Sequence, residues 1–83
     1  MYYLYILKSS GGRHYIGISA DVKNRVAEHN GGEVKSTKAF RPWEVVHVEK
    51  FADKTEARKR ELFLKKTARA RTELFETIDG AIV

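Results

Sequence analysis

A chain of 83 residues makes one small domain, which buries only about 60–65% of the surface that its unfolded form exposes. Its 42% hydrophobic and 33% charged residues are globular values that exclude a disordered tail, and the absence of cysteine excludes disulfides and thiolate zinc sites. The net charge of +5 favours a polyanionic partner such as nucleic acid.

The chain opens with a predicted β-hairpin. Residues 2–8 are aromatic and branched-aliphatic, residues 13–18 form a shorter run of the same kind, and a Ser-Ser-Gly-Gly turn joins them. Alternation places Tyr5 on one side of the first strand, and it places Tyr15 and Gly17 together on one side of the second. If those sides coincide, the two tyrosines share a polar site, and Gly17 leaves room for a close approach to the backbone. The apolar start stops at Lys8, so we expect neither a signal peptide nor a membrane span, and a cytoplasmic location.

Residues 19–21 (Ser-Ala-Asp) supply N-cap candidates for a helix that is predicted to run to about Asn30, which precedes two glycines. Val22 and Val26 share its core-facing side. Arg25 and His29 form a second row, so both project from the same side of the helix.

Residues 31–42 show no periodicity and are predicted to form a loop, and residues 43–51 are predicted to form a third strand. Alternation groups Trp43 with Phe51 on one side of that strand. Asp53 and Glu56 have the spacing of a capping box, after which helical signals continue to residue 79. We expect two helices there, about 54–66 and 69–78, because one helix of that length is unusual in so small a domain.

The element order is therefore β-β-α-β-α-α, which predicts an α+β fold: a three-stranded antiparallel sheet flanked by helices. The positive charge is concentrated on one element. Residues 54–71 contain eight basic and two acidic side chains, a formal charge of +6. The basic candidates for nucleic-acid binding lie in the loop and in this segment: Lys35, Lys38, Arg58, Lys65, Lys66 and Arg69.

The polar candidates each have an ordinary explanation beside a catalytic one. A tyrosine in a strand usually packs in the core, but it can act as a general base if a neighbour takes its proton. Arg25 is a surface cation or a group that stabilises an anionic phosphate in the transition state. His29 either relays a proton or stabilises the end of its helix when it is protonated.

Glu61 is the most informative acid, because with Ala57, Leu64 and Ala68 it follows an inward-facing helical stripe. A carboxylate in that position must be paired, protonated or metal-bound. The alternative is a boundary position paired with a nearby cation, and stripes through Leu62 or Phe63 remain open. A single carboxylate with waters suits Mg²⁺ or Mn²⁺, and the spacing of the histidines makes a zinc site improbable.

The ordered set of motifs resembles the GIY-YIG nuclease superfamily, specifically its small single-domain bacterial members. Tyr3-Leu4-Tyr5 stands where that family has its first motif and Tyr15-Ile16-Gly17 where it has its second. Arg25 with His29-Asn30 resembles the helix motif. Thr37 and Pro42 resemble the loop, and the segment from Glu56 through Glu61 to Lys65 resembles the second helix.

The resemblance implies that residues 1–83 form one nuclease domain that cuts DNA phosphodiester bonds with one divalent metal, giving 5′-phosphate and 3′-hydroxyl ends. Tyr5 and Tyr15 would bracket the attacking water, with either one as general base. His29 would assist that base, Arg25 would hold the phosphate, and Glu61 would hold Mg²⁺ or Mn²⁺. Ile18 stands where some relatives carry lysine, so the tyrosine must be activated by another group.

Longer relatives draw target choice from an attached DNA-reading domain, and we expect none here. We therefore expect low sequence specificity and a role in DNA repair or processing, on single-stranded or structured DNA. The first alternative is a non-catalytic nucleic-acid binding module on the same fold. The second is a protein-interaction scaffold whose basic helix docks an acidic partner.

Overall fold

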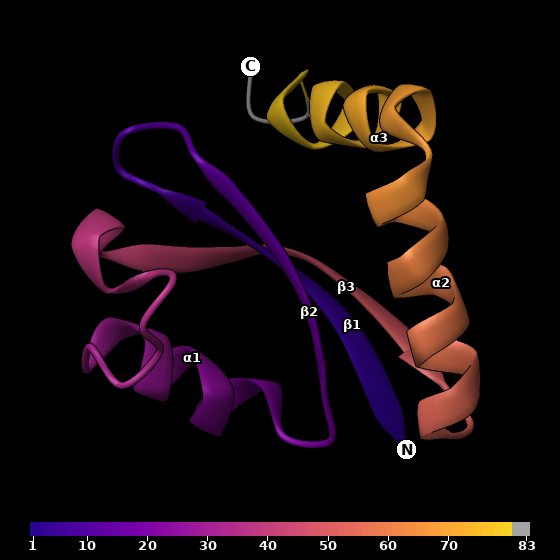
Figure 1. Ribbon diagram of the computed structural model, residues 1–83, viewed down its shortest axis with the longest axis horizontal. Helices are drawn as coiled ribbons and strands as arrows, with labels where there is room; N and C mark the ends of the chain where they lie inside the picture. Colours follow the sequence, from indigo (N-terminus) through magenta and orange to yellow (C-terminus); the bar gives the residue numbers. More distant parts are fainter. Residues whose placement is uncertain (81–83) are drawn as a thin grey trace.

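The computed structural model describes residues 1–80 and has the expected order β-β-α-β-α-α (Figure 1). The expected α+β class is confirmed. In chain order, the elements are β1 (Tyr2–Ser9), β2 (His14–Ser19), α1 (Val22–Asn30), a 3₁₀ turn (Lys38–Phe40), β3 (Trp43–Phe51), α2 (Lys54–Lys66) and α3 (Ala68–Gly80). Among the described residues, no helix has both the length and the apolar character needed to cross a membrane.

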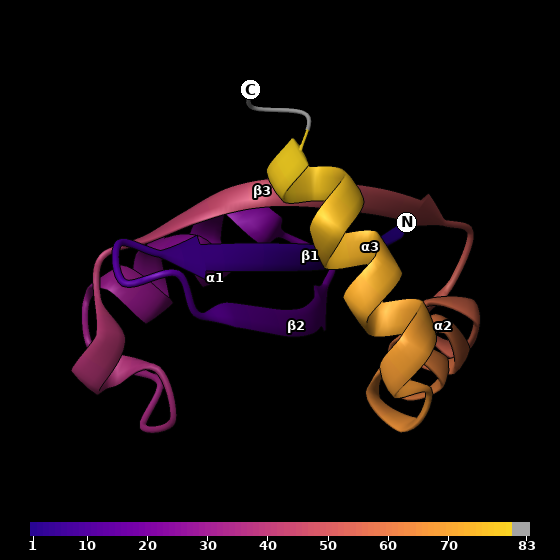
Figure 2. The same cartoon turned by 90° about the horizontal axis from the view of Figure 1, so that it is seen from above.

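The sheet is antiparallel with the order β2-β1-β3, so the first strand is central. Four consecutive residues of β1, from Leu4 to Leu7, are no more than 1% exposed, because helices cover both faces of the sheet. Figures 1 and 2 show α1 on one side and the angled pair α2–α3 on the other. The β1–β2 turn contains Gly12 at φ +88°, a conformation that glycine adopts readily.

The two faces of the sheet form separate cores. Under α1, Tyr5, Leu7 and Trp43 pack with the expected Val22 and Val26. Under α2 and α3 lies the larger cluster: Leu4, Ile6, Ile16, Leu64 and Ile78, with Ile18, Val46, Phe51, Ala70, Leu74 and Phe75 against it. The inward side of α3 thus supplies Ala70, Leu74, Phe75 and Ile78 to this core.

The prediction that Trp43 and Phe51 lie on the same side of the third strand is wrong. The β1–β3 register shifts between Ile6 and Leu7, which gives β3 one extra residue there. As a result Trp43 packs under α1, whereas Val46 and Phe51 pack under α2 and α3. An irregularity of this kind inverts the alternation beyond it.

The long C-terminal helical segment breaks where expected. Asp53 caps α2 by accepting a hydrogen bond from the Glu56 amide at 2.9 Å. The helix ends at Lys66, and Thr67 leaves the helical conformation with φ −111° and ψ 88°. Arg71 then donates to the carbonyl oxygen of Lys65 at 3.0 Å, so a side chain of α3 satisfies the end of α2.

Candidate functional site

The site begins with Tyr5, whose ring lies across the backbone of the neighbouring strand. Tyr5 pairs with Gly17 in the β1–β2 ladder. A Cβ at residue 17 would lie 2.6 Å from the Tyr5 hydroxyl oxygen and 3.0 Å from the Tyr15 ring. The two tyrosines share one face of the sheet, as alternation predicted, with ring centroids 6.3 Å apart. Gly17 makes the room that the sequence indicated, and the Tyr5 ring fills it.

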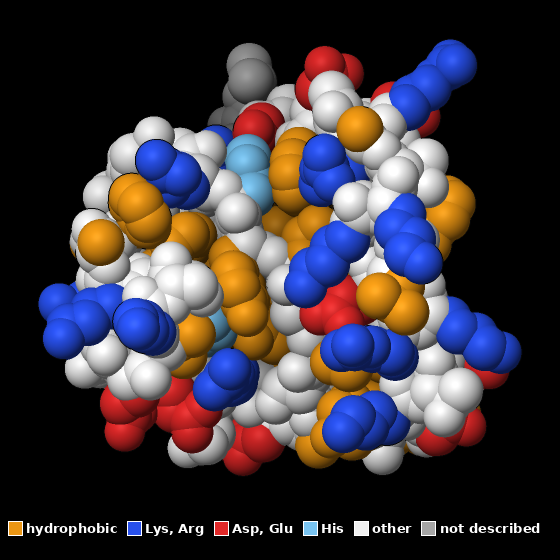
Figure 3. Space-filling view, in the orientation of Figure 1, with side chains coloured by type: hydrophobic (Ala, Val, Ile, Leu, Met, Phe, Trp, Pro, Cys, Tyr) orange, Lys and Arg blue, Asp and Glu red, His pale blue; other side chains and the backbone are white. Residues whose placement is uncertain are grey.

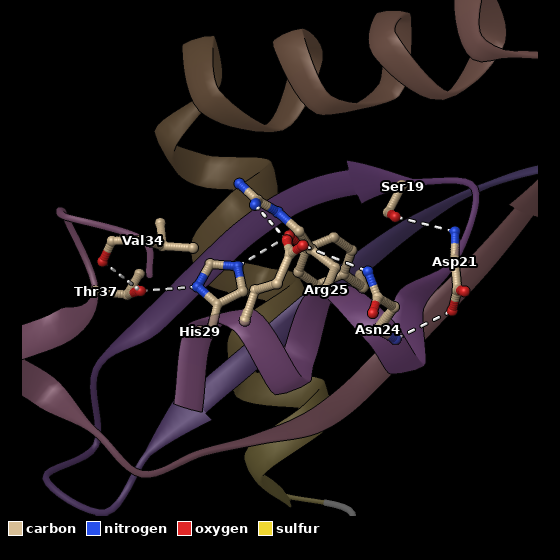
Figure 4. A network of polar contacts seen from close by, with 9 residues as sticks. Ser19, Asp21, Asn24, Arg25, His29, Val34 and Thr37 are labelled. Atoms are coloured by element: carbon tan, nitrogen blue, oxygen red, sulfur yellow. Dashed lines mark hydrogen bonds and ion pairs between the residues drawn. The ribbon is translucent and has the colours of Figure 1, made fainter. Parts of the chain in front are cut away.

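His29 lies at the end of the Tyr5 side chain. It is fully buried, its Nε2 is 3.1 Å from the Tyr5 hydroxyl, and its Nδ1 is 2.7 Å from Thr37 Oγ1 (Figure 4). The Tyr15 ring meets the imidazole edge-on, with centroids 4.7 Å apart. The helix row predicted for His29 therefore brings it against both tyrosines.

Thr37 determines which nitrogen of His29 carries the proton. Its hydroxyl donates to the carbonyl oxygen of Val34 at 3.3 Å, which leaves the oxygen to accept from His29 Nδ1–H (Figure 4). Nε2 is then the acceptor, and the Tyr5 hydroxyl donates its proton to it. This network assigns a direction to the hydrogen bonds, from Tyr5 through His29 and Thr37 to Val34.

Burial keeps this pair uncharged. It is the main cause that raises the pKa of Tyr5 to about 12, and the neighbouring Tyr15 and Glu61 add to the rise. The Arg25 guanidinium, close to the Tyr5 hydroxyl, acts in the opposite direction. Burial and then the charge of Arg25 lower the pKa of His29 below its ordinary value. At neutral pH the site therefore holds a phenol hydrogen-bonded to a neutral imidazole.

Arg25 supplies the positive charge of the site. It lies one helical turn before His29 on α1 and donates through one guanidinium nitrogen to Glu28 at 2.8 Å. Its side chain is 37% exposed. The remaining donors can therefore reach a bound anion, and the predicted placement of Arg25 beside His29 is confirmed.

Glu61 lies on the inward face of α2. Ala57, Glu61 and Leu64 are buried, whereas Leu62 and Phe63 are exposed, so the packing selects one of the three stripes that the sequence left open. Ala68 is exposed, and the stripe ends at Leu64.

The Glu61 carboxylate is paired with two cations of its own helix. Arg58 lies 3.2 Å from one carboxylate oxygen and Lys65 lies 3.1 Å from the other. Its charge also raises the pKa of Tyr5, which places it near the tyrosine site.

The candidate site offers a divalent cation one protein ligand, the Glu61 carboxylate. Among residues 1–80, no three side chains of His, Cys, Asp or Glu cluster as a metal cage. Glu61 offers hard carboxylate oxygens, and Mg²⁺ commonly binds through one carboxylate together with waters and phosphate oxygens. The residues therefore fit an ion that is completed by water and a bound phosphate.

The basic candidates remain exposed on the loop and the two C-terminal helices. Lys and Arg side chains gather over α2 in Figure 3. Lys35 and Lys38 lie on the loop, far from α2 in sequence, and Arg69 is 90% exposed at the start of α3. Nucleic-acid contact by these residues stays a prediction.

Sequence reasoning assigned no role to the clamp that holds the loop. The Asn30 side chain accepts from the Trp43 amide at 2.6 Å and donates to the Trp43 carbonyl at 2.9 Å, and the Trp43 indole donates to the Thr37 carbonyl at 3.0 Å. Loop residues 31–42 have no periodicity from which this could be read. The resemblance placed Thr37 in the loop motif, but its contact with His29 follows only from the folded geometry.

The three-stranded antiparallel sheet with helices on both faces makes this a small α+β domain, and Tyr5, Arg25 and His29 come together where α1 packs on the sheet. The chain belongs to the GIY-YIG family: the model of the GIY-YIG catalytic domain matches residues 1–74. This is a family of endonucleases that are generally metal-dependent and act on nucleic acid.

Similar proteins carry the name UPF0213. One from Halobacterium salinarum is 40% identical over 74 residues, covering 88% of this chain and 96% of its own. One from Listeria innocua is 45% identical over 69 residues, covering 82% and 77%. The solution NMR structure of a UPF0213 protein from Bacillus halodurans superposes with a TM-score of 0.57 at 32% identity, covering 96% of this chain and 87% of that one.

Proposed function

We propose that residues 1–83 form a single nuclease domain, a metal-dependent endonuclease that hydrolyses DNA phosphodiester bonds to 5′-phosphate and 3′-hydroxyl ends. The observation that carries the proposal is the buried Tyr5–His29–Thr37 network with Arg25 beside it. Hydrolysis of a phosphodiester needs a route for a proton away from water and a cation at the phosphate, and these residues supply both.

Tyr5 acts as the base through His29. With a pKa of about 12, it is not a phenolate at neutral pH. Its proton passes to His29 Nε2 as it accepts one from the attacking water, whose oxygen forms the new bond to phosphorus. The O3′ leaving group departs and takes a proton from solvent. His29 is a competent acceptor because its low pKa keeps it neutral and Thr37 holds its other nitrogen as a donor.

Arg25 and Tyr15 position the reactants. The exposed donors of Arg25 bind the non-bridging oxygens of the scissile phosphate, where charge develops in the transition state. Tyr15 packs edge-on against His29 and is less buried than Tyr5, so its hydroxyl orients the water.

Glu61 would hold Mg²⁺ or Mn²⁺. A bound cation of this class neutralises charge on the phosphate and on the leaving oxygen. Arg58 and Lys65, which now pair with Glu61, lie at the same place and contact backbone phosphates together with Lys35, Lys38, Lys66 and Arg69. Phosphate contacts of this kind carry no sequence information, which fits low sequence specificity. The proposed role is DNA repair or processing in the cytoplasm.

The test is cleavage of single-stranded, duplex and branched DNA with Mg²⁺ or Mn²⁺, beside Glu61→Ala and Arg25→Ala. We expect cleavage by the unmodified protein, none in EDTA, and losses of about 100-fold or more in both variants. Metal-dependent cutting that survives both substitutions would overturn the site.

One observation favours a second function. Both oxygens of Glu61 are occupied by cations, as expected for a domain that only binds nucleic acid. Such a module shows salt-sensitive binding to DNA and no metal-dependent cutting on any of the three substrates.

A further inference from the structure

A pocket opens directly beside the proposed catalytic residues. Its volume is about 420 Å³, within the range of about 300–1,000 Å³ typical of small-molecule sites. In Figure 3, hydrophobic side chains line the hollow between the α1 half and the α2–α3 half of the molecule, with Lys and Arg on both sides. The walls of the pocket are mainly aromatic and include one guanidinium: Arg13, His14, Tyr15, Phe40, Trp43 and Phe75.

A guanidinium–ring contact and a stacked pair of rings shape these walls. The Arg13 guanidinium carbon lies 3.9 Å from the centroid of the Phe40 ring, which joins the hairpin to the 3₁₀ turn. The His14 and Phe75 rings stack at 4.1 Å with an interplanar angle of 9°, which joins β2 to α3. Planar π faces and a guanidinium plane are the surfaces on which proteins stack unpaired bases.

The pocket is continuous with the proposed active site. Tyr15 and Thr37 line it, and the same two side chains contact His29. Trp43 also lines the pocket, with its ring centroid 6.4 Å from that of Tyr15 and its indole donating to the Thr37 carbonyl. A group held here is therefore next to the phosphate that Arg25 would bind.

We propose that this pocket binds one unpaired nucleobase of the strand being cut, adjacent to the scissile phosphate. The inference rests on the proposed function and names its substrate class: single-stranded nucleic acid, or a duplex with an unpaired nucleotide at the cleavage position. A base within a regular duplex is already stacked and paired, and it reaches the pocket only after it is flipped out, which costs a few kcal/mol.

Binding is measurable without cleavage. Trp43 is the single tryptophan of the chain and lines the pocket, so a stacked base should quench its fluorescence. The probes are a 12-residue oligothymidylate and an abasic oligomer with the same number of phosphates, both titrated in EDTA. We expect the oligothymidylate to quench Trp43 fluorescence and to bind about tenfold more tightly than the abasic chain, because stacking of one base contributes about that much affinity.

Phe40→Ala tests the stacking wall. Phe40 is 38% exposed and lies outside both core clusters, so the variant should fold. We expect it to weaken oligothymidylate binding about tenfold and to leave the abasic chain unaffected, and Phe40→Tyr should restore binding. Thermal unfolding of each variant checks the fold.

Phe63→Ala is the matched control. Phe63 is also an exposed phenylalanine beside an arginine, with Arg60 5.7 Å from its ring centroid, but it lies on α2 outside the pocket. The Phe63→Ala variant should bind both probes with the affinity of the unmodified protein. Equal binding of the two probes by the unmodified protein, or equal losses for both probes in Phe40→Ala, overturns the pocket. If the pocket test succeeds and no DNA is cut, only the catalytic proposal fails.

Discussion

The Tyr5 hydroxyl passes so close to Gly17 that a Cβ on residue 17 would lie 2.6 Å from it, well inside van der Waals contact. Gly17→Ala should therefore displace the phenol from His29. Because Tyr5 is 1% exposed and tightly packed, we expect a loss of about 1–3 kcal/mol in the free energy of unfolding. Cleavage should fall by about 100-fold, the lower end of what general-base catalysis provides. Denaturant unfolding and a cleavage assay measure the two effects.

Gly11→Ala is the control for that substitution. A Cβ on Gly11 meets only Ser9 Oγ, at 3.9 Å, so stability and cleavage should stay close to those of the unmodified protein. If Gly17→Ala cuts DNA as well as Gly11→Ala does, the Tyr5–His29 contact is not part of the mechanism.

Thr37→Val should separate the role of the hydroxyl from that of the loop. The substitution preserves shape and leaves the buried His29 Nδ1–H without its acceptor, which costs about 1–3 kcal/mol. The imidazole then no longer favours the tautomer that accepts from Tyr5, so cleavage should fall by about tenfold or more. Thr37→Ser keeps the hydroxyl and should keep most of the activity. Similar losses in both variants would mean that Thr37 serves only loop packing.

Local signals predicted most of this fold. The Ser-Ser-Gly-Gly turn, the Asp53 cap and the alternation of the hairpin each act within a few residues, and each was confirmed. The cap of α1 also fell among its three candidates, residues 19–21, with Asp21 as the capping residue. The facing of β3 failed because its irregularity arises from pairing with β1, about forty positions away in sequence, and no local pattern encodes it.

The site was predictable only in part, for the same reason. Helical periodicity placed Arg25 beside His29, but it left three equivalent stripes on α2, and only packing against the sheet selected the one with Glu61. Thr37 comes from an aperiodic loop that Asn30 and Trp43 hold in place. No sequence periodicity predicts the Asn30–Trp43 contact or the Trp43–Thr37 contact. The group that sets the tautomer of His29 therefore could not be identified from the sequence pattern.

The buried His29 should make folding sensitive to mild acid. Its folded-state pKa lies below the unfolded value of about 6.5, so the unfolded chain binds more protons. The corresponding stability is fully present above about pH 6.5 and is lost as pH falls toward the folded pKa, by up to about 1.4 kcal/mol per pH unit.

The measurement is denaturant unfolding at pH 7.5 and pH 5.5. The unmodified protein should lose more stability between these values than His29→Gln, which cannot be protonated at this position. Burial raises the pKa of Glu49, but its hydrogen bonds with Arg60 and His47 lower it overall, and the hydrogen bond from Lys8 lowers the pKa of Asp79. These carboxylates therefore stay charged throughout this window. Equal losses in both proteins would show that His29 does not resist protonation.

Glu61→Gln should abolish stabilisation by a divalent metal. An ion that binds the folded state with one site adds about 1.4 kcal/mol at ten times its dissociation constant, so Mg²⁺ or Mn²⁺ should raise the Tm of the unmodified protein and EDTA should reverse the rise. Glu56→Gln changes an exposed carboxylate of the same helix and should respond to metal normally. A metal-dependent Tm rise in Glu61→Gln equal to that in Glu56→Gln would remove Glu61 as the ligand.

The basic surface should act through phosphate charge alone. Lys38 and Lys66 are exposed and lie on the loop and at the end of α2, two elements far apart in sequence. If both contact phosphates of a single strand, the double variant Lys38→Ala/Lys66→Ala should reduce the slope of log K against log salt by about 1.4, at about 0.7 per contact. The loss of affinity should be similar for different sequences, because phosphate contacts do not read bases. Lys50→Ala removes an exposed lysine of β3 outside the predicted set and should leave the slope unchanged. A double variant with the slope of Lys50→Ala would place the nucleic acid elsewhere on the molecule.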